Sequence, residues 1–115
     1  MMFRKKNEMS LNRVRDHVVI KEGDDRLKLY VDADPLRIVA GLNQAQKMMR
    51  EITDETPEEE REKIAEYFAA VLFGEKQAKE LIEFYHHDPA CIFNICGKYF
   101  GQKLAKKITK AQKKA

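Results

Sequence analysis

The sequence predicts a mainly α-helical single domain of about four helices, preceded by an N-terminal β-hairpin. Three observations lead to this prediction. Apolar residues recur at spacings of three and four over most of the chain after Asp34, one short stretch before it alternates with a period of two, and each proline follows a capping residue at a helix start. A chain of 115 residues is long enough for one domain that needs no disulfide or metal.

The hairpin is expected at residues 18–32. Leu27, Leu29 and Val31 alternate with Lys28 and Tyr30, as in a strand with one buried face, and residues 23–25 (Gly-Asp-Asp) supply the turn. A lone hairpin is only marginally stable, so this one must pack on helices. Residues 1–17 are assigned to a separate, partly ordered N-terminal segment, and the domain is assigned to residues 18–115.

Four helices are predicted, near residues 35–52, 57–73, 75–86 and 89–112. The first and last start at Asp-Pro pairs, Asp34-Pro35 and Asp88-Pro89, in which a carboxylate caps the helix and proline takes its first position. The last helix continues into the basic C-terminal end, so it is described as 89–115.

The second predicted helix opens at Thr56-Pro57. Glu59 stands three residues after Thr56, which is the spacing of a capping box. Gly74 should end this helix or bend it sharply. The third helix then ends at the His86-His87 pair.

The core is expected to gather around the second helix, which is apolar nearly all round from Ile64 onward. Gly97 and Gly101, four residues apart on the last helix, should permit the close approach of a neighbouring helix. The residues predicted to be buried lie on the apolar faces of their helices: Leu42, Tyr67, Phe68, Val71, Leu72, Leu81, Phe93 and Phe100.

No residue set predicts catalysis, a cofactor or a metal, since the glycine-rich phosphate loops and the nucleophile elbow are both missing from the sequence. His86 and His87 are the only candidates for acid–base or zinc chemistry. Asp88-Pro89 interrupts the helix after them, and adjacent histidines point in different directions. We therefore expect a helix-end pair. Cys91 and Cys96, five residues apart, should be unpaired reduced thiols.

The acidic run at residues 58–62 has two readings. Its carboxylates could bind a cation, but they more simply form a solvated first turn that complements the positive end of the helix dipole. We favour the second reading.

Charge is segregated along the chain. Residues 98–115 carry seven lysines and no acid, whereas residues 32–97 hold 7 basic and 14 acidic side chains, and such a division suggests binding. Three uses of the lysine-rich end remain open: a solvated helix end, docking on an acidic protein through the lysines and the stripe of Ile108 and Ala111, and contact with nucleic acid. Nucleic acid is least favoured, because this end has no arginine and no aromatic residue after Phe100.

Nothing in the sequence predicts export or membrane insertion. Residues 1–8 are too short and too polar for a signal peptide, and no apolar run approaches the roughly 20 residues that span a bilayer. A cytoplasmic protein that does not enter the membrane is expected.

Five short segments between residues 18 and 115 follow one another in an order that suggests a known protein family. They are Leu29-Tyr30-Val31-Asp32-Ala33-Asp34-Pro35, Leu42-Asn43-Gln44-Ala45-Gln46-Lys47, Leu72-Phe73-Gly74-Glu75-Lys76-Gln77-Ala78, Tyr99-Phe100 and Ile108-Thr109-Lys110-Ala111-Gln112-Lys113-Lys114. In this order, over residues 18–115, the chain resembles the small tail assembly chaperones of long-tailed, siphovirus-like bacteriophages and prophages.

This resemblance implies a mostly helical protein without enzyme activity, present in the cytoplasm of the bacterial host during virion morphogenesis. Its implied partners are the long, aggregation-prone tape measure protein and the tail tube protein, which it would help to recruit; it could also form a homo-oligomer. The resemblance assigns no catalytic, cofactor or metal residue. Two alternatives remain: a nucleic-acid-binding accessory protein that uses the basic C-terminal helix, and a structural component of the tail or of head completion.

Overall fold

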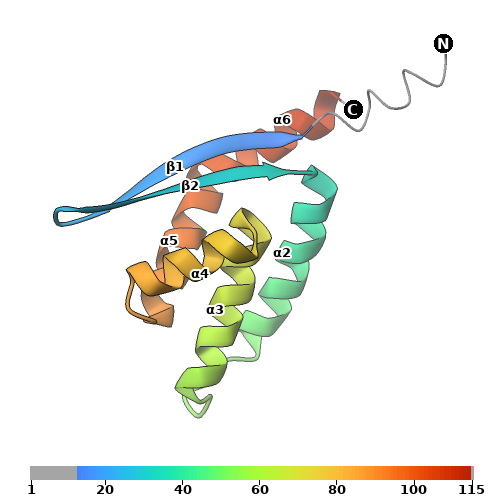
Figure 1. The fold of residues 1–115 in the computed structure, drawn as a ribbon. Helices are drawn as coiled ribbons and strands as arrows, with labels where there is room; N and C mark the ends of the chain where they lie inside the picture. The colour runs from blue at the N-terminus through green and yellow to red at the C-terminus, as the bar shows by residue number, and fades with distance from the viewer. Residues whose placement is uncertain (1–12, 115) are drawn as a thin grey trace.

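The computed structural model describes residues 13–114, with side chains as far as residue 111, as a β-hairpin laid across one end of a group of helices (Figure 1). This is the mainly α architecture with an N-terminal two-stranded antiparallel hairpin that the sequence predicts. Residues 1–12, which make up most of the predicted N-terminal segment, lie outside the described residues.

Two nine-residue strands form the hairpin: β1 (Val14–Glu22) and β2 (Asp25–Ala33) pair antiparallel without interruption. Gly23 and Asp24 form the turn, and the φ of +61° at Gly23 is a conformation that glycine adopts without steric cost. The strands alternate buried and exposed side chains, so one face packs on the helices and the other faces solvent.

The hairpin begins four residues earlier than the predicted start at Val18. Val14 is buried and pairs with Ala33 at the far end of the hairpin. The inward side chain between the two valines is Asp16, which breaks the apolar alternation on which the sequence prediction depends. The boundary of the N-terminal segment at residue 17 is therefore wrong, because residues 14–17 belong to the sheet.

The helices α2 (Pro35–Arg50) and α3 (Glu58–Phe73) run antiparallel and pack against each other (Figure 1). Asp34 caps α2 as predicted, since its Oδ1 accepts a hydrogen bond from the N–H of Leu36 at 2.9 Å.

The predicted capping box at the start of α3 is wrong. The cap of this helix is Pro57, without a side-chain hydrogen bond, and the Thr56 hydroxyl accepts a bond from the Thr53 N–H at 2.8 Å. Arg61 also donates to the carbonyls of Thr53 and Thr56. The Thr56 side chain thus stabilises the preceding loop, and the helix begins two residues after it.

The contact between α2 and α3 is tightest at Gly41. A Cβ at this position would lie 2.8 Å from Cγ1 of Val71, closer than two carbon atoms normally approach. The predicted close approach at Gly97 and Gly101 is wrong, because both are exposed and no described atom beyond their own helix backbone lies within 4 Å of a Cβ built there.

Gly41→Ala should destabilise the protein, although alanine favours a helix over glycine by about 1 kcal/mol. The added methyl group must displace Val71, a stiff β-branched side chain, and overpacking of this kind costs about 1–3 kcal/mol. Urea denaturation should give a lower free energy of unfolding. In the double variant with Val71→Ala the two losses should not add. A Gly41→Ala variant that is more stable than the wild type by the full propensity gain of about 1 kcal/mol would show that Val71 moves aside without cost.

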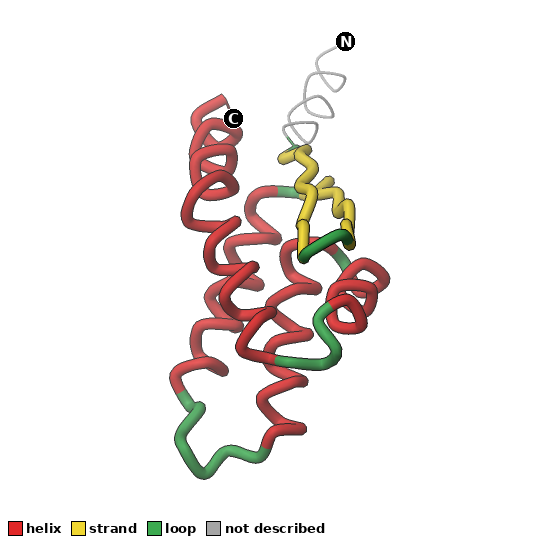
Figure 2. Tube along the Cα trace, turned by 90° about the vertical axis from the view of Figure 1, so that its left-hand side faces the viewer, coloured by secondary structure: helices red, strands yellow, loops and turns green. Residues whose placement is uncertain are grey.

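The C-terminal half contains α4 (Glu75–Phe84) and a long, nearly continuous helix composed of α5 (Pro89–Tyr99), the π-helical turn η1 (Phe100–Leu104) and α6 (Ala105–Lys114) (Figure 2). Gly74, with φ of +87°, ends α3 and starts α4, as predicted. Within residues 13–114, none of the helices combines the length and the apolar character needed to cross a bilayer.

The π-helical turn determines which side chains of the last helix are buried. The N–H of Ala105 bonds to the carbonyl of Phe100, five residues earlier, and the wider turn lets both Tyr99 and Leu104 face the core. Regular α-helical spacing placed Phe100 in the core, but Phe100 is only half-buried. The prediction of one regular helix over 89–112 is wrong in this turn.

Apolar side chains from every element meet in one core. Four of the predicted core residues are buried: Leu42, Phe68, Leu72 and Leu81. Three are half-buried: Val71, Phe93 and Phe100. The prediction is wrong for Tyr67, which is 36% exposed. A domain of this size covers one side of α3 and leaves part of the other side exposed.

Candidate functional site

The two histidines at the end of α4 act as the sequence predicts. Both have positive φ, +54° at His86 and +63° at His87, and the N–H of His87 bonds to the Ile82 carbonyl at 2.8 Å. The His87 ring Nδ1 lies 3.0 Å from Oε2 of Glu62, a residue of the acidic run. Within residues 13–114, no three histidine, cysteine, aspartate or glutamate side chains lie together as possible metal ligands.

Cys91 and Cys96 are free thiols, as predicted. Cys96 is buried, and its burial raises the thiol pKa to about 12. Burial also raises the pKa of Cys91, helped by a hydrogen bond from its Sγ to Oδ2 of Asp88 at 3.4 Å. Both thiols are therefore protonated at neutral pH and are poor nucleophiles.

The lysine-rich helix packs back onto its own domain. Ile108 is 4% exposed and Ala111 packs against the core, so this apolar stripe is not available to an acidic partner. Docking through this stripe was one of the three uses that the sequence left open, and the contacts of α6 with β1 and α2 do not favour it. The lysines remain exposed at residues 103, 106, 107 and 110. The side chains of Lys113 and Lys114 lie outside the described residues.

A polar contact beneath the hairpin joins the last helix to β1. The Tyr99 hydroxyl donates to Oδ2 of Asp16 at 2.7 Å, and Nζ of Lys107 lies 3.7 Å from Oδ1. Burial by itself raises the pKa of Asp16, but hydrogen bonds from Tyr99 and the His17 backbone, with the charges of Lys107 and Lys103, make the net pKa lower than usual. Burial and the bond to Asp16 raise the pKa of Tyr99.

Stability should fall in acid through Asp16. Its folded-state pKa lies below the ordinary value of 3.8, so its contribution is present above that pH and is lost as the pH falls through the folded-state pKa. Tyr99→Phe removes one cause of the lowered pKa. The variant should be less stable than the wild type at neutral pH, and the difference in urea midpoint should shrink as the pH falls below 3.8. A difference that is constant with pH would show that the hydroxyl acts only through packing.

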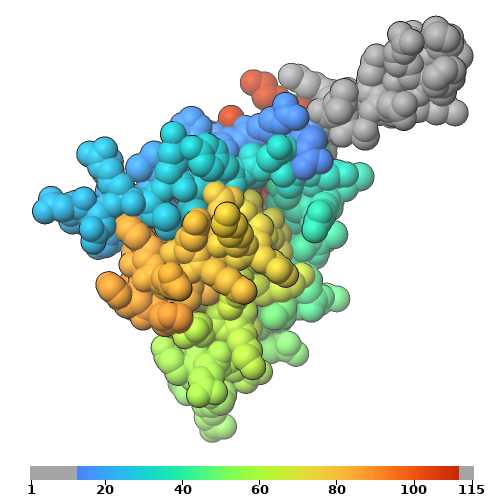
Figure 3. Space-filling view, in the orientation of Figure 1, coloured from blue at the N-terminus to red at the C-terminus, as the bar shows by residue number. Residues whose placement is uncertain are grey.

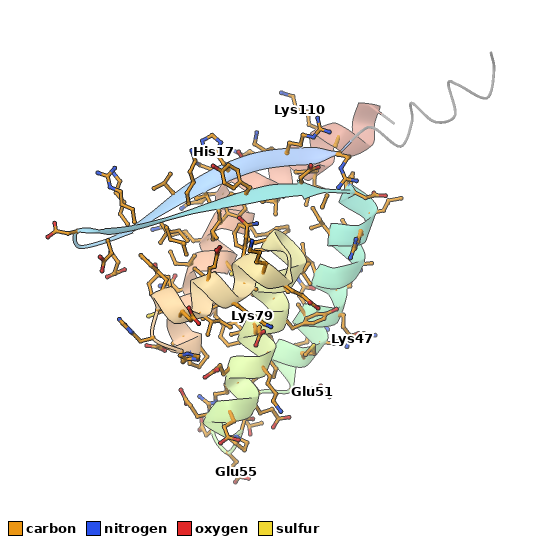
Figure 4. All side chains as sticks on the ribbon, viewed as in Figure 1. His17, Lys47, Glu51, Glu55, Lys79 and Lys110 are labelled. Carbon is orange, nitrogen blue, oxygen red and sulfur yellow. The ribbon has the colours of Figure 1, made fainter. Side chains whose placement is uncertain are left out.

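The solvent face of the hairpin is basic. Its outward side chains are Arg15, His17, Val19, Lys21, Arg26, Lys28, Tyr30 and Asp32. Asp32, the acid on this face, lies 2.6 Å from Nε of Arg13 and 3.5 Å from Nε of Arg15, and the Arg13 hydrogen bond leads the causes that lower its pKa. In Figure 4 the labelled His17 and Lys110 both lie at the end of the molecule that carries the hairpin and α6.

A groove of about 650 Å³ lies between α2 and α3, near the end of the hairpin. Its apolar walls come from stripes of small and aromatic residues on the two helices: Ala40 and Gly41 on α2, and Tyr67, Ala70 and Val71 on α3. Its rim is charged, with Arg13, Asp32, Asp34, Arg37 and Glu75. Figure 3 shows the face of the molecule on which α2, α3, α4 and the hairpin meet.

Apolar groups are exposed in and beside this groove. Tyr67 is 36% exposed, and Leu36, one helical turn before Ala40, is 67% exposed. An apolar surface rimmed by charges is typical of a protein-binding site.

No family model, no curated protein and no solved structure matches this chain. The groove between α2 and α3 and the basic face are thus the features from which a function can be inferred. The apolar character of α3 on nearly all sides was the sequence signal for the groove, since it exceeds what a small domain can cover. The prediction assigned all of it to the core.

Proposed function

We propose that this chain is a tail assembly chaperone of a long-tailed bacteriophage or prophage, acting in the cytoplasm of the bacterial host. It binds the tape measure protein, helps to recruit the tail tube protein during tail morphogenesis, and catalyses no reaction. The observation that carries this proposal is the exposed apolar groove between α2 and α3. The resemblance of residues 18–115 to such chaperones supports it and names the client.

The groove suits a helical client. On α3, Tyr67 lies three residues before Ala70 and four before Val71, so these side chains share one face, and Gly74 continues the groove just beyond the end of the helix. On α2 the exposed lining residue Ala40 has a side chain of a single methyl group, so an incoming helix can approach the backbone of α2 closely. An amphipathic helix binds such a groove through its apolar face. Tyr67 is the kind of large, semi-exposed side chain that often contributes most to binding energy.

The rim of the groove fits a client that is long and variable in sequence. Arg37 and Glu75 stand on different helices, and the Arg13–Asp32 pair closes the end near the hairpin. Because both signs of charge are present, the rim does not select one charge class. Affinity then depends on the apolar walls of the groove, against which any amphipathic segment of a long helical protein can pack.

Co-expression tests this proposal. A tape measure protein encoded beside this chain should be soluble and should co-purify with it. Tyr67→Ser should reduce both soluble yield and co-purification, whereas Tyr30→Ser, at a tyrosine that is 54% exposed on the hairpin, should change neither. The proposal fails if the tape measure protein is equally soluble with and without the chain and never co-purifies.

The basic face favours a second candidate function, that of a nucleic-acid-binding accessory protein. Lys21 and Arg26 lie directly opposite each other on this face, and like charges in such positions destabilise a hairpin. Phosphate groups would relieve that repulsion. Binding of duplex DNA that falls steeply with salt would support this alternative.

A further inference from the structure

The two outer edges of the hairpin differ. Along β2, the side-chain amide of Gln77 from α4 takes the place of a neighbouring strand. Its Oε1 accepts a hydrogen bond from the N–H of Tyr30 at 2.8 Å, and its Nε2 donates to the Tyr30 carbonyl at 2.7 Å. The same Nε2 donates to the Phe73 carbonyl at 2.7 Å, which holds the amide in position. Gln77 therefore blocks the addition of a strand at this edge.

The edge of β1 is open near the turn. The residues that flank a two-residue turn bond to each other through both backbone groups, and bonding alternates from there along the pair. In this register Val18 and Ile20 bond to β2, whereas the N–H and C=O groups of Val19 and Lys21 point away from it. Among the described residues, these outward groups have no hydrogen-bond partner.

A groove of about 240 Å³ lies along this open edge. β1 forms one wall, and the long C-terminal helix, with Phe73 at the end of α3, forms the other. The groove is lined by the apolar rings and side chains of Phe73, Ile95 and Tyr99. The charged residues that line it are all lysines: Lys21, Lys98 and Lys103. A strand edge beside a helix, with apolar side chains between them, can bind an extended peptide by strand addition.

We infer that the open edge of β1 binds an extended acidic segment of a partner protein as a third strand. The main chain of the peptide satisfies the backbone groups of Val19 and Lys21. Alternate side chains of a strand point to opposite faces, so one apolar set enters the groove and the other, acidic set faces the solvent side near the lysines. Phe73 is the one residue that lines both this site and the groove between α2 and α3 among the described residues, and this inference does not depend on the proposed function.

Charge decides what occupies the edge. The lining lysines attract an acidic segment and repel a basic one. If a second copy of this chain paired edge to edge, its lysines and Arg15 would lie close to the same positive residues of the first copy, and these like charges would repel each other. An acidic peptide from another protein is therefore the favoured occupant.

Peptide titration into the full-length protein tests the inference. The probe is a blocked hexapeptide of alternating valine and glutamate. It should bind saturably, more weakly at high salt, and should slow amide hydrogen exchange at Val19 and Lys21. The amides of Val18 and Ile20, already bonded within the hairpin, serve as internal controls and should change little. The same peptide with lysine in place of glutamate should not bind.

Two lysine variants make the test specific. Lys98→Glu should weaken binding of the valine–glutamate peptide by about tenfold or more, whereas Lys79→Glu on α4 (Figure 4) should leave it unchanged. Both side chains are exposed, and circular dichroism checks that both variants fold. Absence of saturable binding, binding without protection of Val19 and Lys21, or equal weakening in the two variants would overturn the inference. So would a dimer that protects these amides without peptide, because the edge would then belong to a second copy.

Discussion

Phe68→Ala should lower the free energy of unfolding by about 3–5 kcal/mol. Phe68 is 5% exposed and belongs to the core at the middle of α3, so its removal leaves a cavity among side chains that cannot all move to fill it. A loss of this size is a large fraction of the stability of a small domain. Equilibrium urea denaturation measures it, and the variant should also melt at a markedly lower temperature.

Tyr67→Ala is the matched control for Phe68→Ala. The two aromatic residues are adjacent on α3, but Tyr67 faces the groove and is 36% exposed. Its replacement should cost well under half as much as that of Phe68. If the two variants lose equal stability, both sides of α3 are equally buried and the groove does not exist as an open surface.

Ile108→Ala should cost about 2–3 kcal/mol, near the lower end of the range for a buried isoleucine, because its site close to the end of a helix can partly collapse. Ile108 is 4% exposed and belongs to the same core as the hairpin. The loss should appear in the same cooperative urea transition as the loss from Phe68→Ala, since α6 packs on β1.

Lys110→Ala provides the comparison for Ile108→Ala. Lys110 is exposed on the same helix, and its replacement should change the free energy of unfolding by no more than about 0.5 kcal/mol. If Ile108→Ala has an equally small effect, α6 frays from the domain. Its apolar stripe would then be free to dock a partner, which is one of the three uses that the sequence left open.

Helix boundaries were the part of the fold most accessible from the sequence. Asp34 and Asp88 each cap a helix through a hydrogen bond to an N–H two residues later, at 2.9 and 3.0 Å, so the whole interaction lies within a few residues of chain. Gly74 likewise marks a boundary through its own φ of +87°. Signals of this kind depend on local geometry alone.

The features that sequence reasoning missed depend on residues far apart in the chain. Asp16 occupies an inward position of β1 because the Tyr99 hydroxyl, 83 residues away, donates to it. The π-helical turn that points Tyr99 inward has no local marker in the sequence. Gly41 was overlooked for the same reason, since its importance lies in Val71 on another helix.

Of the candidate functional surfaces, the sequence predicted the basic charge of the C-terminal end but not the groove between α2 and α3. The sequence indicated a lysine-rich end, and its lysines at residues 98, 103, 106, 107 and 110 are exposed, but the open reading of docking through Ile108 did not foresee that Ile108 is buried in the core of its own domain. On α3, apolar residues surround Tyr67 and Phe68 alike in the sequence, so the periodicity predicted that both are buried. Which of the two is covered depends on how many neighbouring helices pack on each side, and this is decided by the tertiary fold.

Site-specific photo-crosslinking tests the central claim, that the groove between α2 and α3 holds a tape measure protein. A photo-reactive amino acid is placed at position 67, in the groove, or at position 30, on the solvent face of the hairpin, and each form is co-expressed with the tape measure protein encoded beside this chain. We expect a crosslink to the tape measure protein from position 67 and none from position 30. Co-purification without a crosslink from position 67, or crosslinks of equal yield from both positions, would contradict it.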